Sequence, residues 1–150
     1  MGSDLISFFI PGEPVPTGRG RAAIVAGHAH VFTPRRTRDY QNLVRLAAAK
    51  AMNGRPPLDT AVVVGIEIWL PIPASMSKRK REHAILGALL PAKKPDLDNC
   101  IRSCTDGMSR IVYRDDALIV SLYAGKRYSD KPGVSVKVRP ALTPEQWKQP

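Results

Sequence analysis

The clearest hydrophobic pattern in the chain lies between residues 60 and 70. Every second residue on one face of this segment is aliphatic: Val62, Val64, Ile66, Ile68 and Leu70. Such alternation predicts a β-strand, and because the second face is also largely apolar, the strand should lie in the middle of a sheet. Glu67 interrupts that second face. It is either an outward-facing charge or a supporting ligand for an acidic site.

Other stretches of the sequence predict the remaining strands and helices of a single domain. β-rich runs predict strands over residues 3–10, 118–128 and 134–139. Residues 22–25 and 30–33 predict a hairpin around Gly27. Helical periodicity predicts helices over residues 38–52, with Thr37 as the N-cap and Asn53-Gly54 as the stop, and over residues 99–108. A basic helical turn begins at Ser77. The whole predicts a single α+β domain over residues 1–150, with one mixed sheet, two or three helices, and a peripheral tail over residues 140–150.

Composition narrows the range of partners. The 150 residues carry a net charge of +10, with 23 basic against 13 acidic side chains, and the basic residues gather in loops and on one helical segment. This distribution favours a nucleic acid over a membrane surface. No run of about 18 apolar residues and no signal-peptide pattern occurs, so we expect a cytoplasmic protein. Cys100 and Cys104, four residues apart on a predicted helix, should be free thiols.

Two acidic clusters stand out against this basic background. The first is Lys93-Lys94-Pro95-Asp96-Leu97-Asp98-Asn99. Asp96 and Asp98, two residues apart, can aim at one point, and two close carboxylates with no nearby His or Cys suit Mg²⁺ or Mn²⁺. The alternative is that one of them only caps the helix that follows. The second cluster, Asp115-Asp116, follows that helix. If the strand after this helix runs back along it, Asp115 or Asp116 would lie beside Asp96 and Asp98.

These residues resemble the RusA-type Holliday junction resolvases. The core pattern of the family is similar to Lys94-Pro95-Asp96-Leu97-Asp98-Asn99, then Arg102, then Ile111-Val112-Tyr113-Arg114-Asp115-Asp116. The order of the elements upstream of this core also resembles the family, so that the likeness covers residues 10–127. Some family members carry aromatic residues before the first aspartate, thought to wedge into the junction. This chain has Lys94-Pro95 at that position, so we assign no wedge residue to it.

The resemblance implies an endodeoxyribonuclease that uses Mg²⁺, with Mn²⁺ as a substitute, to cut four-way DNA junctions by paired symmetric nicks as a homodimer. It implies no small-molecule cofactor. It assigns Asp96, Asp98 and Asp116 as metal ligands, Asp115 as a weaker candidate, and Arg102 as a phosphate clamp in place of the usual lysine. An arginine keeps the charge of that lysine, but it cannot lend a proton.

The basic residues expected at DNA are Arg19, Arg21, Lys78, Arg79, Lys80, Lys93 and Lys94. For Lys78, Arg79 and Lys80, a merely solvated helix face is the alternative. Two other functions stay open: a flap or fork nuclease, and a basic DNA-binding protein without catalysis.

Overall fold

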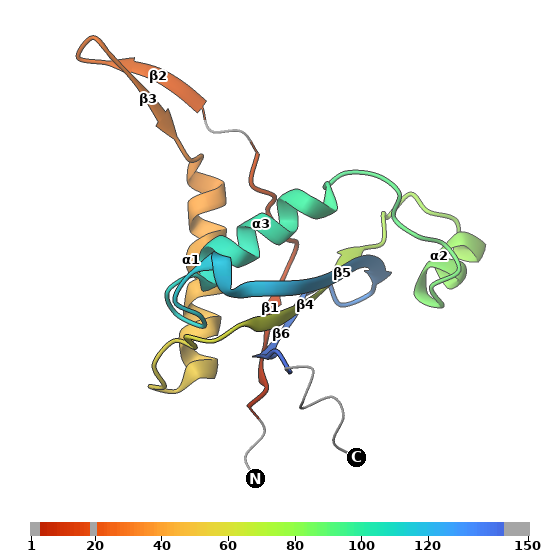
Figure 1. Ribbon diagram of the computed structural model, residues 1–150. Coiled ribbons are helices and arrows are strands. Elements are labelled where there is room, and N and C mark those ends of the chain that lie inside the picture. Colours follow the sequence, from red (N-terminus) through yellow and green to blue (C-terminus); the bar gives the residue numbers. More distant parts are fainter. Residues whose placement is uncertain (1–3, 19–20, 143–150) are drawn as a thin grey trace.

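The computed structural model describes residues 4–18 and 21–142 (Figure 1). Its main sheet has four strands in the order β1-β6-β4-β5. The bounds of these strands are β1, Ile6–Pro11; β4, Val62–Pro71; β5, Ile119–Ser129; and β6, Gly133–Pro140. β4 lies in the interior of the sheet, parallel to β5 and antiparallel to β6, and β1 pairs antiparallel with β6. The sheet is therefore mixed, and the predicted central position of residues 60–70 is confirmed.

The remaining elements of the described residues are three α-helices, a short 3-10 turn and a separate ribbon. α1 spans Arg35–Met52, α2 spans Lys78–Ile85 and α3 spans Leu97–Met108. A short 3-10 turn, η1, spans Asp116–Leu118. β2 (Arg21–Val25) and β3 (His28–Phe32) pair only into a two-stranded sheet that extends away from the body of the protein (Figure 1). The predicted α+β class, the number of helices and the hairpin are all confirmed.

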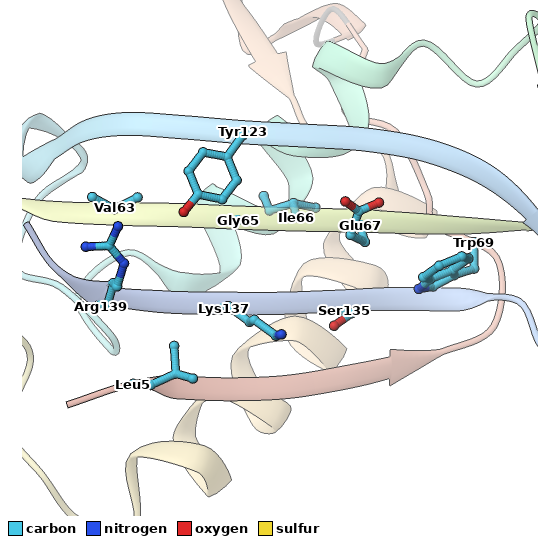
Figure 2. A pocket seen from close by; sticks show the side chains of 10 residues that line it. All are labelled: Leu5, Val63, Gly65, Ile66, Glu67, Trp69, Tyr123, Ser135, Lys137 and Arg139. Carbon is cyan, nitrogen blue, oxygen red and sulfur yellow. The ribbon is translucent and has the colours of Figure 1, made fainter. Parts of the chain in front are cut away.

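One face of the main sheet forms the core. Val64 of β4, Val44 of α1 and Cys104 of α3 are fully buried in one hydrophobic cluster. Cys100 is buried there as well, and both cysteines are free thiols, as predicted. The opposite face of the sheet carries a hollow whose lining includes Glu67, Tyr123 and Lys137 (Figure 2).

Glu67 is exposed on this second face, because it alternates with the buried residues of β4. It therefore points away from α1 and α3. Its interpretation as an outward-facing charge agrees with the structure, whereas a role as a ligand beside the acids of α3 does not.

α1 and α3 approach each other closely at a glycine. Gly107 of α3 is buried, and a Cβ atom at this position would lie 2.7 Å from two carbon atoms of Val44. Glycine thus lets the two backbones come together. This contact fixes how α3, which carries Asp98 and Asp106, sits on the rest of the fold.

Several predicted boundaries are wrong. α1 begins at Arg35, with Pro34 at the N-cap position, and the Thr37 side chain is buried instead, 3.5 Å from the carbonyl oxygen of Pro16. Residues 110–112 form a turn after α3, and Tyr113 makes isolated bridges with Leu58 and Ser109. β6 continues through Pro140, which was expected in the tail. Residues 143–150, the rest of that tail, lie outside the described residues.

Candidate functional site

The amino end of α3 carries the first acidic cluster. Asp96 stands at the N-cap position of α3 with an extended backbone, but its side chain caps no backbone N–H. Its Oδ2 instead accepts a hydrogen bond from Lys94 Nζ at 2.7 Å. The interpretation of Asp96 as a capping side chain is therefore wrong. Asp98 lies in the first turn of α3, where the helix dipole favours a carboxylate, and its side chain is exposed.

α3 presents charged side chains on one exposed face. Asp98, Arg102 and Asp106 follow one another at intervals of four residues, so they project from the same side of the helix, and all three are exposed. The opposite side is buried against the core through Cys100, Cys104 and Met108. Arg102 thus stands on this exposed face with a carboxylate one turn away on each side.

Asp106 is a site residue that the sequence analysis missed. Its Oδ2 accepts a hydrogen bond from Gln41 Nε2 of α1 at 3.3 Å. Loss of solvent around the carboxyl raises the pKa of Asp106, the charge of Asp116 raises it further, and Arg102 acts in the opposite direction. The spacing of four residues from Arg102 was the signal that could have found it.

The two aspartates of the second acidic cluster differ in their contacts. Asp115 caps η1, since its Oδ1 accepts a hydrogen bond from the backbone N–H of Ala117 at 2.7 Å. Asp116 is exposed. Its charge acts on Asp106 and on the buried Tyr113, whose pKa is raised above its ordinary value first by burial and then by Asp116 and Asp106. Asp116 therefore belongs to the carboxyl half of α3.

This placement differs from the expected meeting of Asp116 with Asp96 and Asp98. The chain does return after α3, but the turn is held close to the end of that helix: Tyr113 Oη donates to the carbonyl oxygen of Thr105 at 3.1 Å. Asp106 lies eight residues beyond Asp98, about 12 Å along the helix axis. Within residues 4–18 and 21–142, no group of three His, Cys, Asp or Glu side chains is arranged to hold a metal ion.

Lys126 of β5 is a second residue that the sequence analysis missed. Its Nζ donates hydrogen bonds to the carbonyl oxygens of Lys93, at 2.5 Å, and Pro95, at 3.0 Å. The pKa of the Cys100 thiol is raised by burial to about 11, while Lys126 lowers it and Asp96 and Asp98 raise it. Lys126, Asp96 and Asp98 therefore all act on the Cys100 thiol, and Lys126 holds the segment that leads into Asp96 through its backbone carbonyls. No sequence motif marks this lysine.

The predicted DNA-binding residues that the structure describes lie on α2 and beside Asp96. Lys78, Arg79 and Lys80 are exposed at the start of α2, where the Ser77 hydroxyl caps the helix by accepting from Lys80 N–H at 3.3 Å. Lys93 and Lys94 are exposed beside Asp96. Arg19 lies outside the described residues, and so does the side chain of Arg21.

A shallow hollow adjoins the first cluster. It has a volume of about 370 Å³, and its lining includes Arg36, Lys94, Asp96 and Asn99. Arg36, which belongs to α1, was not among the expected DNA-binding residues. Basic side chains from two separate parts of the chain thus meet at Asp96.

Carboxylates flanked by cationic side chains on an exposed helix face, in a small basic α+β domain, are typical of enzymes that act on nucleic-acid phosphates. The family model described as "Endodeoxyribonuclease RusA" matches residues 11–139, nearly the whole chain. The protein therefore belongs to the RusA endodeoxyribonuclease family, as the resemblance of its acidic core indicated.

A relative from Bacillus subtilis (strain 168) is similar along almost its whole length. It is named "Uncharacterized protein YqaN" and is 35% identical over 140 residues, which cover 91% of this chain and 96% of the relative. Among the described residues of this protein, no helix is both long and apolar enough to span a bilayer.

Proposed function

We propose that this protein is a Mg²⁺-dependent endodeoxyribonuclease that resolves four-way DNA junctions by paired symmetric nicks. The observation that carries the proposal is the exposed face of α3, where Asp98 and Arg102 lie one turn apart beside Asp96, in a chain of the RusA family with a net charge of +10. The family supplies the endodeoxyribonuclease class. The metal, the junction and the paired nicks are our proposal.

The donor set at the amino end of α3 fits Mg²⁺. Asp96 and Asp98 offer hard carboxylate oxygens. The described residues include no group of three protein ligands, but Mg²⁺ commonly takes only one or two carboxylates and completes its shell with water and substrate phosphate. A bound Mg²⁺ would supply charge neutralisation at the scissile phosphate and a more acidic water. Mn²⁺ should replace it, because its ligand preferences are similar.

Residues of the chain then hold and orient the phosphate. Lys94 Nζ lies 2.7 Å from Asp96 Oδ2, where its ammonium group can also donate to a phosphate oxygen; Asp96 and Asp98 would hold a divalent cation, which would neutralise charge at that phosphate. Arg102 can grip the phosphate through two parallel N–H groups and stabilise the charge that develops there. Because an arginine does not give up its proton, the 3′ leaving oxygen must be protonated by another group, such as water.

Asp116 takes part from the other end of the α3 face. Its charge and that of Arg102 both act on Asp106, in opposite directions, so Asp116 contributes to the electrostatics at the carboxyl end of this face. As a third metal ligand, Asp116 would have to approach Asp98 when DNA binds. Asp115 is the weaker ligand candidate, since its Oδ1 already accepts the η1 cap hydrogen bond.

Resolution of a four-way junction requires two nicks related by a two-fold axis. A C2 homodimer provides two copies of the α3 face in that relation. Exposed lysines and arginines at α2 and at Asp96 would then hold the DNA arms through their phosphates, and binding should weaken steeply as salt is raised.

The test compares Asp98→Asn with a matched control, Asp130→Asn. Asp130 is an exposed acid in the turn between β5 and β6. Each variant is assayed for Mg²⁺-dependent cleavage and for binding of a synthetic four-way junction, a linear duplex, a flap and a single strand. Asp98→Asn should bind the junction as tightly as the wild type but cut it about 100-fold more slowly or worse, since losing a group that only supports a metal ligand already costs about 10–100-fold. Asp130→Asn should behave as the wild type.

Other outcomes would point to the alternatives. Faster cutting of flaps or forks than of four-way junctions would replace the junction substrate while keeping the nuclease chemistry. Tight binding without cleavage by the wild type, in either Mg²⁺ or Mn²⁺, would leave a DNA-binding protein without catalysis. Equal cleavage by Asp98→Asn and the wild type would remove α3 from the active site.

A further inference from the structure

The β2–β3 ribbon is the most exposed regular element of the protein. It forms a separate two-stranded sheet, all five residues of β3 are exposed, and Figure 1 shows it extending past the amino end of α1. Two-stranded ribbons are marginally stable alone in water. A ribbon of this kind needs a surface to lie against.

The two faces of the ribbon differ in chemistry. Directly paired residues of an antiparallel ribbon share a face, and faces alternate along the strands. The pairs Ala22–Val31 and Ile24–Ala29 therefore form one face, which we call the aliphatic face. Ile24 and Val31 are 80% and 76% exposed. The other face carries His28 and His30, the latter with its ring centroid 6.0 Å from that of Phe32.

The charges around the ribbon indicate what kind of partner can bind there. Residues 21–34 contain no acidic side chain. At the base of the ribbon, α1 opens with three exposed arginines, Arg35, Arg36 and Arg38, of which only Arg35 forms an ion pair among the described residues, with Asp39 at 3.8 Å. The fitting partner thus has anions at its rim and an apolar surface within reach of Ile24 and Val31.

A second copy of this chain fits poorly at this surface, because a two-fold contact would bring the same exposed arginines together at the base of the ribbon. DNA with interrupted stacking fits well. Phosphates meet the arginines, and base faces, which regular stacking hides in a duplex, are open at a branch point. Aliphatic side chains that cover unstacked bases are a known way for proteins to hold distorted DNA.

The ribbon is also connected to the candidate active site. The loop that leads into β2 is fixed to α3: Thr17 N–H donates to the carbonyl oxygen of Asn99 at 3.0 Å, and Thr17 Oγ1 lies 2.7 Å from Ser103 Oγ. Strands of five residues reach about 17 Å. That length corresponds to about five base-pair steps, so the ribbon can touch bases near a phosphate held at α3.

We propose that the β2–β3 ribbon is a DNA-engaging arm whose aliphatic face covers unstacked bases at the branch point. This inference rests on the proposed action on branched DNA and adds the element that recognises the branch. It also assigns base contact to a part of the chain other than Lys94-Pro95, where the family's wedge would stand.

The test measures binding without cleavage. The double variant Ile24→Ser/Val31→Ser is titrated, with no divalent metal present, onto a four-way junction carrying 2-aminopurine at the branch point and onto a linear duplex of the same arms. The control is Leu46→Ser, which alters an aliphatic side chain of similar exposure, 69%, on α1. Circular dichroism melting checks that the variants fold, which is expected because the altered side chains are exposed.

Binding of the wild type should raise the 2-aminopurine emission, because the base at the branch point is unstacked. The double variant should bind the junction on the order of tenfold more weakly, cause no such rise in emission, and bind the linear duplex as tightly as the wild type does. Unchanged junction affinity and emission would overturn the proposal. So would a change from dimer to monomer in sedimentation with unchanged affinity per dimer, which would assign the aliphatic face to a second copy. Junction binding by a wild type that cuts nothing would refute only the proposed nuclease function.

Discussion

Gly107→Ala tests whether the contact between α1 and α3 positions the candidate site. The new Cβ would lie 2.7 Å from both Cβ and Cγ1 of Val44 and 3.0 Å from the carbonyl oxygen of Gln41. Carbon atoms pack at about 3.5–4.0 Å, so the overlap is about 1 Å. Val44 is fully buried and, being β-branched within a helix, has one favoured rotamer, so it cannot turn aside.

Two effects of opposite sign determine how much Gly107→Ala changes the free energy of unfolding. Alanine favours the helix over glycine by about 1 kcal/mol. Overpacking of a rigid core costs about 1–3 kcal/mol, and a backbone oxygen among the clashing atoms favours the upper part of that range. We therefore expect the free energy of unfolding to fall by about 1–2 kcal/mol, and cleavage to fall further than the unfolded fraction explains, since α3 must shift.

Urea unfolding of a double-mutant cycle with Val44→Ala provides the assay. If the clash is the cause, Val44→Ala should cost less in the Gly107→Ala protein than in the wild type, with a coupling energy of about 1 kcal/mol or more. A Gly107→Ala protein that is more stable than the wild type and shows no coupling to Val44 would refute the packing argument.

Two further predictions follow from single buried or bridging groups. Lys126→Met removes the donor to the carbonyl oxygens of Lys93 and Pro95, so the free energy of unfolding should fall by about 1–2 kcal/mol, and amides of residues 93–97 should exchange hydrogen faster; unchanged exchange would contradict the bridge. Burial raises the pKa of the Cys100 and Cys104 thiols from 9.0 to about 11 and about 12. Above pH 9 the unfolded chain releases protons that the folded chain keeps, so stability should be lost as pH rises from about 9 to 12. A Cys100→Ala/Cys104→Ala protein should lose less over that range; equal losses would show that the thiols are not responsible.

Local patterns were sufficient for the sheet and its separate hairpin. The alternation of residues 60–70 predicted β4 because a strand that packs one face on the core carries a buried aliphatic side chain at every second position. The positive φ angles of Asn53 and Gly54 end α1 as the sequence indicated. Strand order followed from no local pattern, since β4 lies between β6 and β5 only through tertiary packing.

The sequence named Asp96, Asp98, Arg102 and Asp116 as candidate site residues, but it did not predict how they are arranged or that Asp106 and Lys126 lie near them. Asp98 and Arg102 share a face because helical spacing alone fixes it. Asp116 could not be placed from the sequence, because its position depends on how Tyr113 folds the following turn against Thr105. The position of Lys126 could not be predicted either. Its side chain donates to backbone carbonyl oxygens, which every residue has, so no sequence pattern marks these hydrogen bonds.

The most direct test of the central claim uses a supercoiled plasmid that extrudes a cruciform, incubated with the wild-type protein and Mg²⁺. Paired symmetric nicks made within one complex convert the plasmid straight to the linear form with ligatable ends. We predict that linear DNA is the first product, that chelation of Mg²⁺ abolishes it, and that Asp98→Asn does not form it. Accumulation of nicked circles without linear product, or no cleavage at all, would contradict the account of this protein as a junction resolvase.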